Sequence, residues 1–254
     1  MGNQTKMSDN CETVEILQAY LKRKAQSHNS YKHYAPIDRI IKIVKEKKLY
    51  LGDGKDWNDT VDSDNFTNSR TKLINFGKCF SYAQDESVAM WMLYGGTYHN
   101  NAMIDFTRTA IRNILNTSTI KLGFWQNGEF VCVSEIKKLD FCIEMVDVVY
   151  YNKKTKYLKR SDESCINVSD TLIDQLGLYG KAYPWSYENE CRLIVSIKKE
   201  MIPEGCNTVE IDLEGIDLGK SLERTYYCPN FEGEKTNNFQ KSKLDGYINF
   251  KLIN

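Results

Sequence analysis

Strand-like segments outnumber helical segments in this sequence, and the two kinds do not alternate regularly along the chain. Short alternations of apolar and polar residues, bounded by turn residues, are typical of strands. We predict strands over residues 49–51, 73–81, 102–106, 141–151, 190–197, 208–213, 222–228 and 247–252, and a hairpin over 123–133 with Asn127-Gly128 as its type I′ turn. This irregular order favours an α+β fold over a doubly wound parallel sheet.

Apolar residues at helical spacing predict helices between these strands. The first covers residues 12–24, with an N-cap among residues 8–10. The second has Pro36 in its first turn and buries Ile37, Ile40, Ile41 and Val44. Further helices are predicted over 85–93, 107–115 and 161–176. Residues 52–70 are rich in Gly, Asn, Asp, Ser and Thr, which predicts a long loop.

Composition excludes several classes of protein. The 254 residues include 34 Lys plus Arg and 34 Asp plus Glu, and this zero formal charge argues against binding nucleic acid or membrane by bulk charge. No window reaches the roughly 18 apolar residues of a membrane span, and residues 1–10 lack the apolar region of a signal peptide. We therefore expect a cytoplasmic protein with no membrane partner, whose eight cysteines are thiols. The spacing of its cysteines and three histidines predicts no zinc site.

The stretch from 185 to 195, W-S-Y-E-N-E-C-R-L-I-V, is the most informative for chemistry. In a strand, alternate residues share a face, so Glu188, Glu190 and Arg192 point together, away from the core. Arg192 would lower the pKa of Glu190 and hold its carboxylate ionised. Such a carboxylate can bind a ribose hydroxyl, stabilise a cationic sugar or accept a proton. The structural alternative is a solvent-facing strand with cross-strand ion pairs.

Two earlier stretches offer ligand-binding side chains. His33 and Tyr34 place a hydrogen-bonding ring beside a stacking ring at the start of the second helix, although both are also ordinary residues for a sheet edge. Ser81 ends a predicted strand, where its hydroxyl could meet a ligand. Trp91 and Tyr94 lie three residues apart on one helical face, a pattern that is also typical of a core.

These stretches resemble, in the same order over about residues 30–230, a widespread family of bacterial and phage proteins known as a domain of unknown function. The matching pieces are residues 31–36 with the following helix, Trp57-Asn58-Asp59, Cys79-Phe80-Ser81, Met90-Trp91 to Tyr94, and W-S-Y-E-x-E-x-R at 185–192. That family in turn resembles ADP-ribosyltransferases, including toxins of toxin–antitoxin and phage-defence systems. The resemblance implies an ADP-ribosyltransferase-like split β-sandwich with flanking helices, in which NAD binds between two small sheets. It also implies the reaction, in which the nicotinamide–ribose bond breaks and ADP-ribose passes to an acceptor.

The resemblance assigns roles to individual residues. Glu190 is the expected catalytic residue and Glu188 its second carboxylate. The expected NAD-binding residues are His33 for the adenosine-side ribose and diphosphate, its neighbour Tyr34, Ser81 on the middle strand, Tyr94 near nicotinamide, and Arg192, which orients Glu190 or contacts a phosphate. The chain departs from the transferases at Ala35, where many have threonine, and in reading Cys-Phe-Ser on the middle strand rather than Ser-Thr-Ser.

The expected organisation is a helical lead over 1–29, the transferase-like domain over 30–230, and an extension with a final strand over 231–254. The expected acceptor is a nucleic acid or a protein. RNA is slightly favoured because the tyrosines and Trp57 could stack on bases. If the protein is a toxin, a neutralising antitoxin would accompany it.

Two other functions compete with this interpretation. Asp105 with the Glu135-x-Lys137 pattern at the end of an apolar strand is also found in Mg²⁺-dependent nucleases of the restriction type. A non-catalytic domain that binds a nucleotide or a partner through the same cleft is equally consistent with the composition. Loss of plasmid integrity with Mg²⁺ would indicate the nuclease, and retention of intact ligand would indicate the binding domain.

Overall fold

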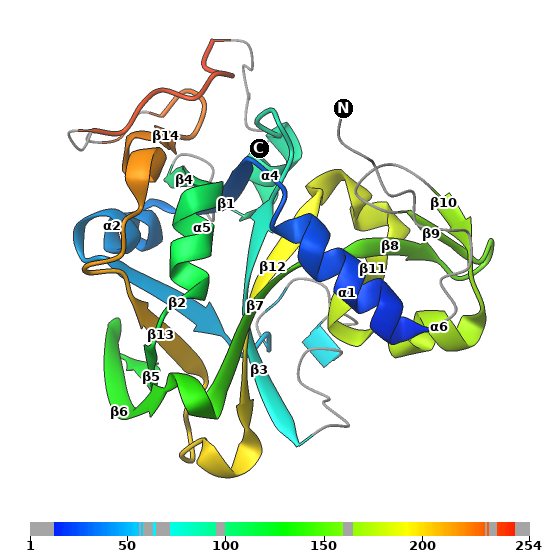
Figure 1. Cartoon of the computed structure of the whole chain (residues 1–254). Helices are drawn as coiled ribbons and strands as arrows, with labels where there is room; N and C mark the ends of the chain where they lie inside the picture. The colour runs from blue at the N-terminus through cyan, green and yellow to red at the C-terminus, as the bar shows by residue number, and fades with distance from the viewer. Residues whose placement is uncertain are drawn as a thin grey trace.

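The computed structural model describes residues 13–55, 57, 63–64, 72–94, 100–159, 165–231, 233 and 238–246. Its described part is an α+β fold, as predicted, with a large antiparallel sheet, a small second sheet and several helices (Figure 1). None of the helices in these ranges is long and apolar enough to cross a membrane.

The large sheet has ten strands. Eight of them run in the order β14 (Thr225–Tyr227), β4 (Asn101–Thr107), β1 (Ser30–Pro36), β3 (Leu73–Ser81), β2 (Lys48–Gly52), β13 (Thr208–Asp212), β5 (Thr119–Gln126) and β6 (Glu129–Lys137). The other two are β12 (Glu190–Lys198), which pairs with β3, and β7 (Phe141–Asp147), which pairs with β12. All these pairs are antiparallel.

The sheet divides at β3. One edge of β3 pairs with β12 along its whole length, so β1 and β2 share the other edge. β1 reaches β3 only at Lys32 opposite Ser81, and β2 only at Gly52 opposite Gly77. The two strands therefore diverge from a common neighbour, and α2 (Ile37–Lys45) connects them. This division leaves space between two half-sheets, one containing β1, β4 and β14, the other β2, β13, β5 and β6.

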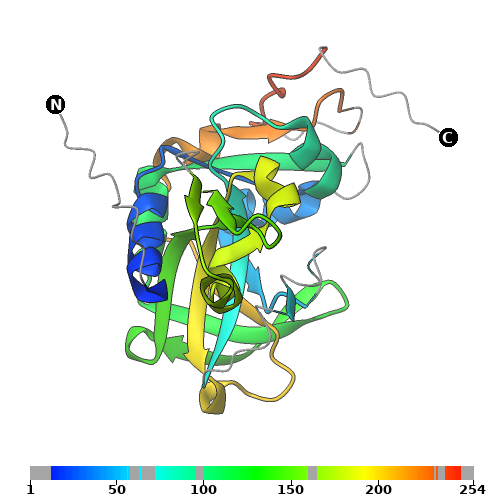
Figure 2. The ribbon, with the colours of Figure 1, turned by 90° about the vertical axis from the view of Figure 1, so that its right-hand side faces the viewer.

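A second sheet of four strands lies beside the first. Its order is β10 (Cys165–Asn167), β9 (Tyr157–Lys159), β8 (Val149–Asn152) and β11 (Gly180–Ala182), with β11 parallel to β8. α1 (Val14–Ala25) lies along one side of the molecule, as Figure 2 shows, and packs against β7. Leu17 and Leu21 of α1 join the apolar cluster between this sheet and α6 (Asp170–Gln175).

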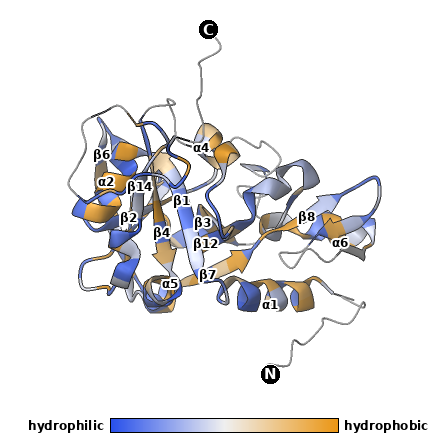
Figure 3. Ribbon diagram, turned by 90° about the horizontal axis from the view of Figure 1, so that it is seen from above, coloured by the Kyte–Doolittle hydropathy of each residue, from blue (hydrophilic) through white to orange (hydrophobic). Residues whose placement is uncertain are grey.

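The main core is formed by side chains of the large sheet together with those of α2 and α5 (Arg108–Leu115). The alternation predicted for residues 190–197 is confirmed, because Cys191, Leu193, Val195 and Ile197 all lie in this core. A separate cluster of Tyr34, Met90, Trp91, Met103 and Cys228 anchors α4 (Val88–Tyr94), which is largely hydrophobic in Figure 3.

Most predicted elements are confirmed, including the hairpin at Asn127-Gly128, where both residues have the positive φ that a type I′ turn requires. Residues 141–151 were predicted as one strand, which is wrong. The chain turns at Val148, whose N–H donates to the carbonyl of Glu190, so β7 and β8 enter different sheets. Val146, Val148 and Val149 all favour a strand and conceal the break, although Asp147 interrupts them.

The single helix predicted over 161–176 is also wrong, since β10 occupies 165–167 and the helix spans only Asp170–Gln175. Ser169 caps α6 and its side chain accepts from the N–H of Leu172. The first helix is capped by Thr13, and the helix predicted from 85 begins at Val88. Four predictions fall wholly or mainly outside the described residues: the cap at 8–10, the loop at 52–70, and the strand at 247–252 with most of the extension around it.

Candidate functional site

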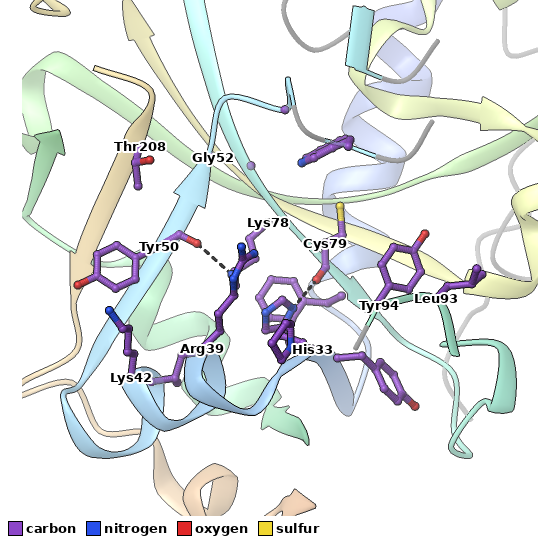
Figure 4. A pocket seen from close by; sticks show the side chains of 18 of the residues that line it. His33, Arg39, Lys42, Tyr50, Gly52, Lys78, Cys79, Leu93, Tyr94 and Thr208 are labelled. Atoms are coloured by element: carbon purple, nitrogen blue, oxygen red, sulfur yellow. Dashed lines mark hydrogen bonds between the residues drawn. The ribbon is translucent and has the colours of Figure 1, made fainter. Parts of the chain in front are cut away.

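A cavity of about 720 Å³ opens where β1 and β2 diverge, a volume typical of small-molecule sites. Its walls are β1, α2, β2, β3 and α4, with the β5–β6 hairpin at one end. Lys181, Glu188 and Glu190 line the other end. The view into the cavity shows His33 beside Cys79, between Arg39 and Tyr94 (Figure 4).

Glu188 and Glu190 both line the cavity, but they are not alternate residues of one strand as predicted. Glu190 is the first residue of β12, whereas Glu188 ends a 3₁₀-helix, Tyr183–Glu188. Asn189 between them adopts the left-handed conformation, with φ 46°, which asparagine tolerates better than most residues. Both carboxylates therefore reach the same ammonium group, with Lys181 Nζ 2.6 Å from Glu188 Oε2 and 3.2 Å from Glu190 Oε2.

Glu190 is held as a carboxylate. Burial alone would raise its pKa, but the Arg192 guanidinium and the Lys181 ammonium outweigh burial and hold the pKa of Glu190 well below its usual range. Arg192 Nε donates to Glu190 Oε1 at 2.6 Å. The Cys79 thiol, whose own pKa burial raises, also hydrogen-bonds this carboxylate. Glu190 thus presents a fixed negative charge in the cavity.

Glu188 differs from Glu190 because it titrates near neutrality. Burial raises its pKa to about 7, with the Glu190 charge adding to the rise and Lys181 opposing it. The hydroxyl of Tyr94 donates to Glu188 Oε1, and burial beside this carboxylate raises the pKa of Tyr94. Burial alone would lower the pKa of Lys181, but the two glutamates reverse this and raise it. A carboxyl that titrates near neutrality beside a permanently ionised one is a typical acid–base arrangement.

Arg192 supports the site without lining the cavity. Its side chain is fully buried, donates to Glu190 and to the carbonyl of Leu178, and lies 5.1 Å from the centre of the Trp57 ring. The alternative of exposed cross-strand ion pairs is therefore wrong, because Glu188 and Glu190 are also only 2% exposed. Of the two roles expected for Arg192, this geometry matches the orientation of Glu190.

The His33 side chain lines the cavity, and its two ring nitrogens differ in their partners. Burial, together with the nearby positive charge of Lys78, lowers the pKa of His33 well below its ordinary value, so the ring is neutral. Nδ1 lies 3.1 Å from the carbonyl of Cys79, and a carbonyl only accepts, so Nδ1 carries the proton. Nε2 is then an acceptor, and it is buried with no hydrogen-bond partner among the described residues.

Tyr34 and Ser81 are placed differently from this group. Tyr34 contacts the cavity, but its ring packs edge-on against Trp91 at 4.9 Å and its hydroxyl accepts from the N–H of Ser87. Ser81 lies opposite Glu190 in the β3–β12 pair but does not line the cavity. Its hydroxyl accepts a hydrogen bond from the N–H of Ala83. The structure thus gathers His33, Tyr94, Glu188 and Glu190 around the cavity, with Tyr34 at its wall and Ser81 and Arg192 outside it.

Besides Lys32, four cationic residues line the cavity without a local signal in the sequence. Lys181 lies only seven residues before Glu188, but nothing in its neighbourhood marks it as a partner of both glutamates. Arg39 and Lys42 belong to α2, and Lys78 belongs to β3. These residues come together only because the sheet divides at β3, and no local sequence pattern predicts that division.

The residues of the nuclease alternative are far apart. Asp105 lies on β4, where it pairs with Arg224, and Glu135 lies on β6, beyond five intervening strands of the same sheet. In the part of the chain that the structure describes, there is no group of three His, Cys, Asp or Glu residues that would hold a metal ion.

Comparison with known proteins finds a family that is similar to part of this chain. Residues 90–193 match the family described as Protein of unknown function (DUF2971). This span is less than half of the chain and runs from α4 into β12, so it includes Tyr94, Lys181, Glu188, Glu190 and Arg192. No curated protein and no solved structure matches the chain. The family description states no activity, so a function must be argued from the site.

Proposed function

We propose that this protein is an NAD-dependent ADP-ribosyltransferase whose domain is a variant of the split β-sandwich. The observation that carries the proposal is the pair of buried carboxylates in one cavity, with Glu190 ionised and Glu188 titrating near neutrality. The division of the sheet at β3 supports it, since the cavity lies between two diverging half-sheets.

The two carboxylates suit the two halves of this reaction. As the glycosidic C–N bond breaks, its electron pair leaves with nicotinamide and positive charge develops on the ribose. The Glu190 carboxylate stabilises that charge, which exists only near the transition state. An acceptor O–H or N–H then attacks the ribose carbon, and its proton passes to the carboxylate form of Glu188. Lys181 and Arg192 keep Glu190 charged throughout.

The remaining site residues fit a dinucleotide. The unpartnered Nε2 of His33 is suited to accept a hydrogen bond from a ribose hydroxyl. The ring of Tyr94 lines the cavity beside Glu188, where the nicotinamide would lie. We propose a nucleic acid, with RNA preferred, or a protein as acceptor, and a cytoplasmic role as a toxin or phage-defence effector with a neutralising antitoxin.

The test is incubation of the purified protein with NAD labelled in its adenylate phosphate and a cell lysate. The label is followed into protein, RNA and DNA, and released nicotinamide is measured by chromatography. We expect label in one fraction, which names the acceptor class, and its loss with Glu190→Gln. Glu135→Gln, which alters an exposed carboxylate on β6, is the matched control and should leave labelling unchanged. NAD that is bound but recovered intact, with and without lysate, would instead indicate a binding domain.

The pH dependence of ADP-ribose transfer gives a second prediction. Glu188 faces Lys181, Glu190 and Tyr94, and its pKa is raised to about 7. Below that pH the carboxyl is protonated and does not accept the acceptor's proton, so transfer should rise with pH through about 7. Glu188→Gln should remove this step and lower transfer at pH 8 by about 100-fold. A transfer rate that keeps the same pH profile in Glu188→Gln would contradict the role of this residue.

A further inference from the structure

The end of the cavity opposite the glutamates contains a group of cations that have no carboxylate partner among the described residues. Arg39 and Lys42 extend from α2, and Lys78 extends from β3 (Figure 4). Lys78 Nζ donates to the carbonyl of Tyr50 at 3.0 Å, and Lys42 Nζ donates to the carbonyl of Gly128 at 3.3 Å. None of the three forms an ion pair with a described carboxylate. This group is called the basic end below.

Carboxylates elsewhere in the cavity do not compensate the basic end. Glu188 and Glu190 are bound by Lys181 and Arg192 at the opposite end, and Asp53 pairs with Lys55 at 2.7 Å. Asp38 contacts the cavity from the exposed first turn of α2. The Cys79 thiol is neutral and supplies no negative charge, and burial with the Arg39 charge lowers the pKa of Lys78 to about 8.

A buried lysine beside a second cation is costly unless a ligand supplies negative charge, and Lys78 beside Arg39 is in this position. The aromatic rings beside them add contact surface. Lys42 Nζ lies 4.4 Å from the centre of the Trp125 ring, and Tyr50 packs edge-on against that ring at 4.8 Å. The ring of Trp125 is 40% exposed at the rim of the cavity.

We infer that the basic end is a binding site for the diphosphate of a nucleotide, with Arg39, Lys42 and Lys78 as its phosphate ligands. Arg39 provides the planar donor pair that suits two phosphate oxygens, and the two lysines act as point charges. A small ligand is favoured over a nucleic-acid strand because Lys78 lies inside a cavity of bounded volume rather than on an open groove. The inference rests on the proposed function only for the orientation of the ligand, whose ribose and nicotinamide would extend towards the glutamates.

Calorimetric titration with ADP and with adenosine, near pH 7 and without NAD, tests the basic end by itself. We expect ADP to bind and adenosine to bind at least about tenfold more weakly, since a hydrogen bond to a charged group is worth roughly one power of ten or more. Arg39→Gln should weaken ADP about tenfold. Lys45→Gln is the matched control, because Lys45 lies on the same helix, exposed and outside the cavity. Lys78→Gln should weaken ADP similarly, whereas Lys78→Arg should retain binding.

Each outcome decides the inference. Equal binding of ADP and adenosine, absence of ADP binding, or unchanged affinity in Arg39→Gln would overturn it. Binding of a single-stranded oligonucleotide without binding of ADP would also overturn it, in favour of a nucleic-acid track. The result is separable from the proposed transferase activity. Nicotinamide release without ADP binding would overturn only the inference about the basic end. ADP binding without nicotinamide release would overturn only the proposed transferase activity.

Discussion

Glu190→Gln should lower the rate of nicotinamide release by about 100- to 1000-fold, the usual effect of removing a group that stabilises transition-state charge. The amide keeps the size of the side chain but loses the charge that Lys181 and Arg192 hold in place. NAD affinity should change little, because the interaction develops only as nicotinamide leaves. Single-turnover release of nicotinamide and calorimetric titration of NAD measure the two effects separately.

The same change disturbs two buried cations, so the folded state must be verified. Glu190→Asp provides the second variant, because it keeps the charge and withdraws the carboxylate by one methylene. We expect it to fold as the native protein does, by circular dichroism, and still to release nicotinamide slowly. Native turnover in a folded Glu190→Gln protein would exclude Glu190 as the catalytic residue.

Arg192→Met should lower the free energy of unfolding by about 3–5 kcal/mol, a large part of the roughly 5–15 kcal/mol that stabilises most domains. The reason is that Glu190 would remain buried with one cation instead of two, and the carbonyl of Leu178 would lose a donor. Denaturant unfolding measures the change. Lys156→Met breaks the exposed pair with Asp170 and should alter stability by less than about 1 kcal/mol.

A double-mutant cycle separates the interaction energy of the Glu190–Arg192 pair from the contributions of its surroundings. Glu190→Gln combined with Arg192→Met removes the charge that the single arginine change leaves unpaired, so the two losses should not add. Additive losses, or a loss in Arg192→Met no larger than in Lys156→Met, would show that Lys181 alone satisfies Glu190.

The sequence identifies the carboxylates but not the partners that set their protonation states. The alternation in β12 correctly predicts which of its residues enter the core, because side-chain direction in a strand is a local property. Lys181 reaches the glutamates through β11, which pairs with β8 some 30 residues earlier in the chain. The pKa of Glu188 depends on that long-range pairing and on burial under Tyr94, which are products of the tertiary structure.

The difference between local and long-range interactions also explains the errors in the predicted fold. Local signals located the hairpin at Asn127-Gly128 and the capped helix α5, where Thr107 accepts from the N–H of Ala110. The change of sheet at Val148 left only a weak local signal, the single Asp147 before it, since the valines around it suit both strands. The basic end was missed for the same reason, because Arg39 and Lys78 become neighbours only when β2 and β3 are joined.

The division of the sheet has a consequence for how this protein can diverge. The glutamates stand at the end of β12, whereas the rim of the basic end is formed by α2 and the β5–β6 hairpin, and β3 joins the two regions. Substitutions in the hairpin can therefore change which ligand is accepted while the groups that carry out the chemistry stay in register. Homologous chains should accordingly differ most at the rim around Trp125 and least around Lys181, so that under the proposed function one catalytic centre would serve a range of substrates.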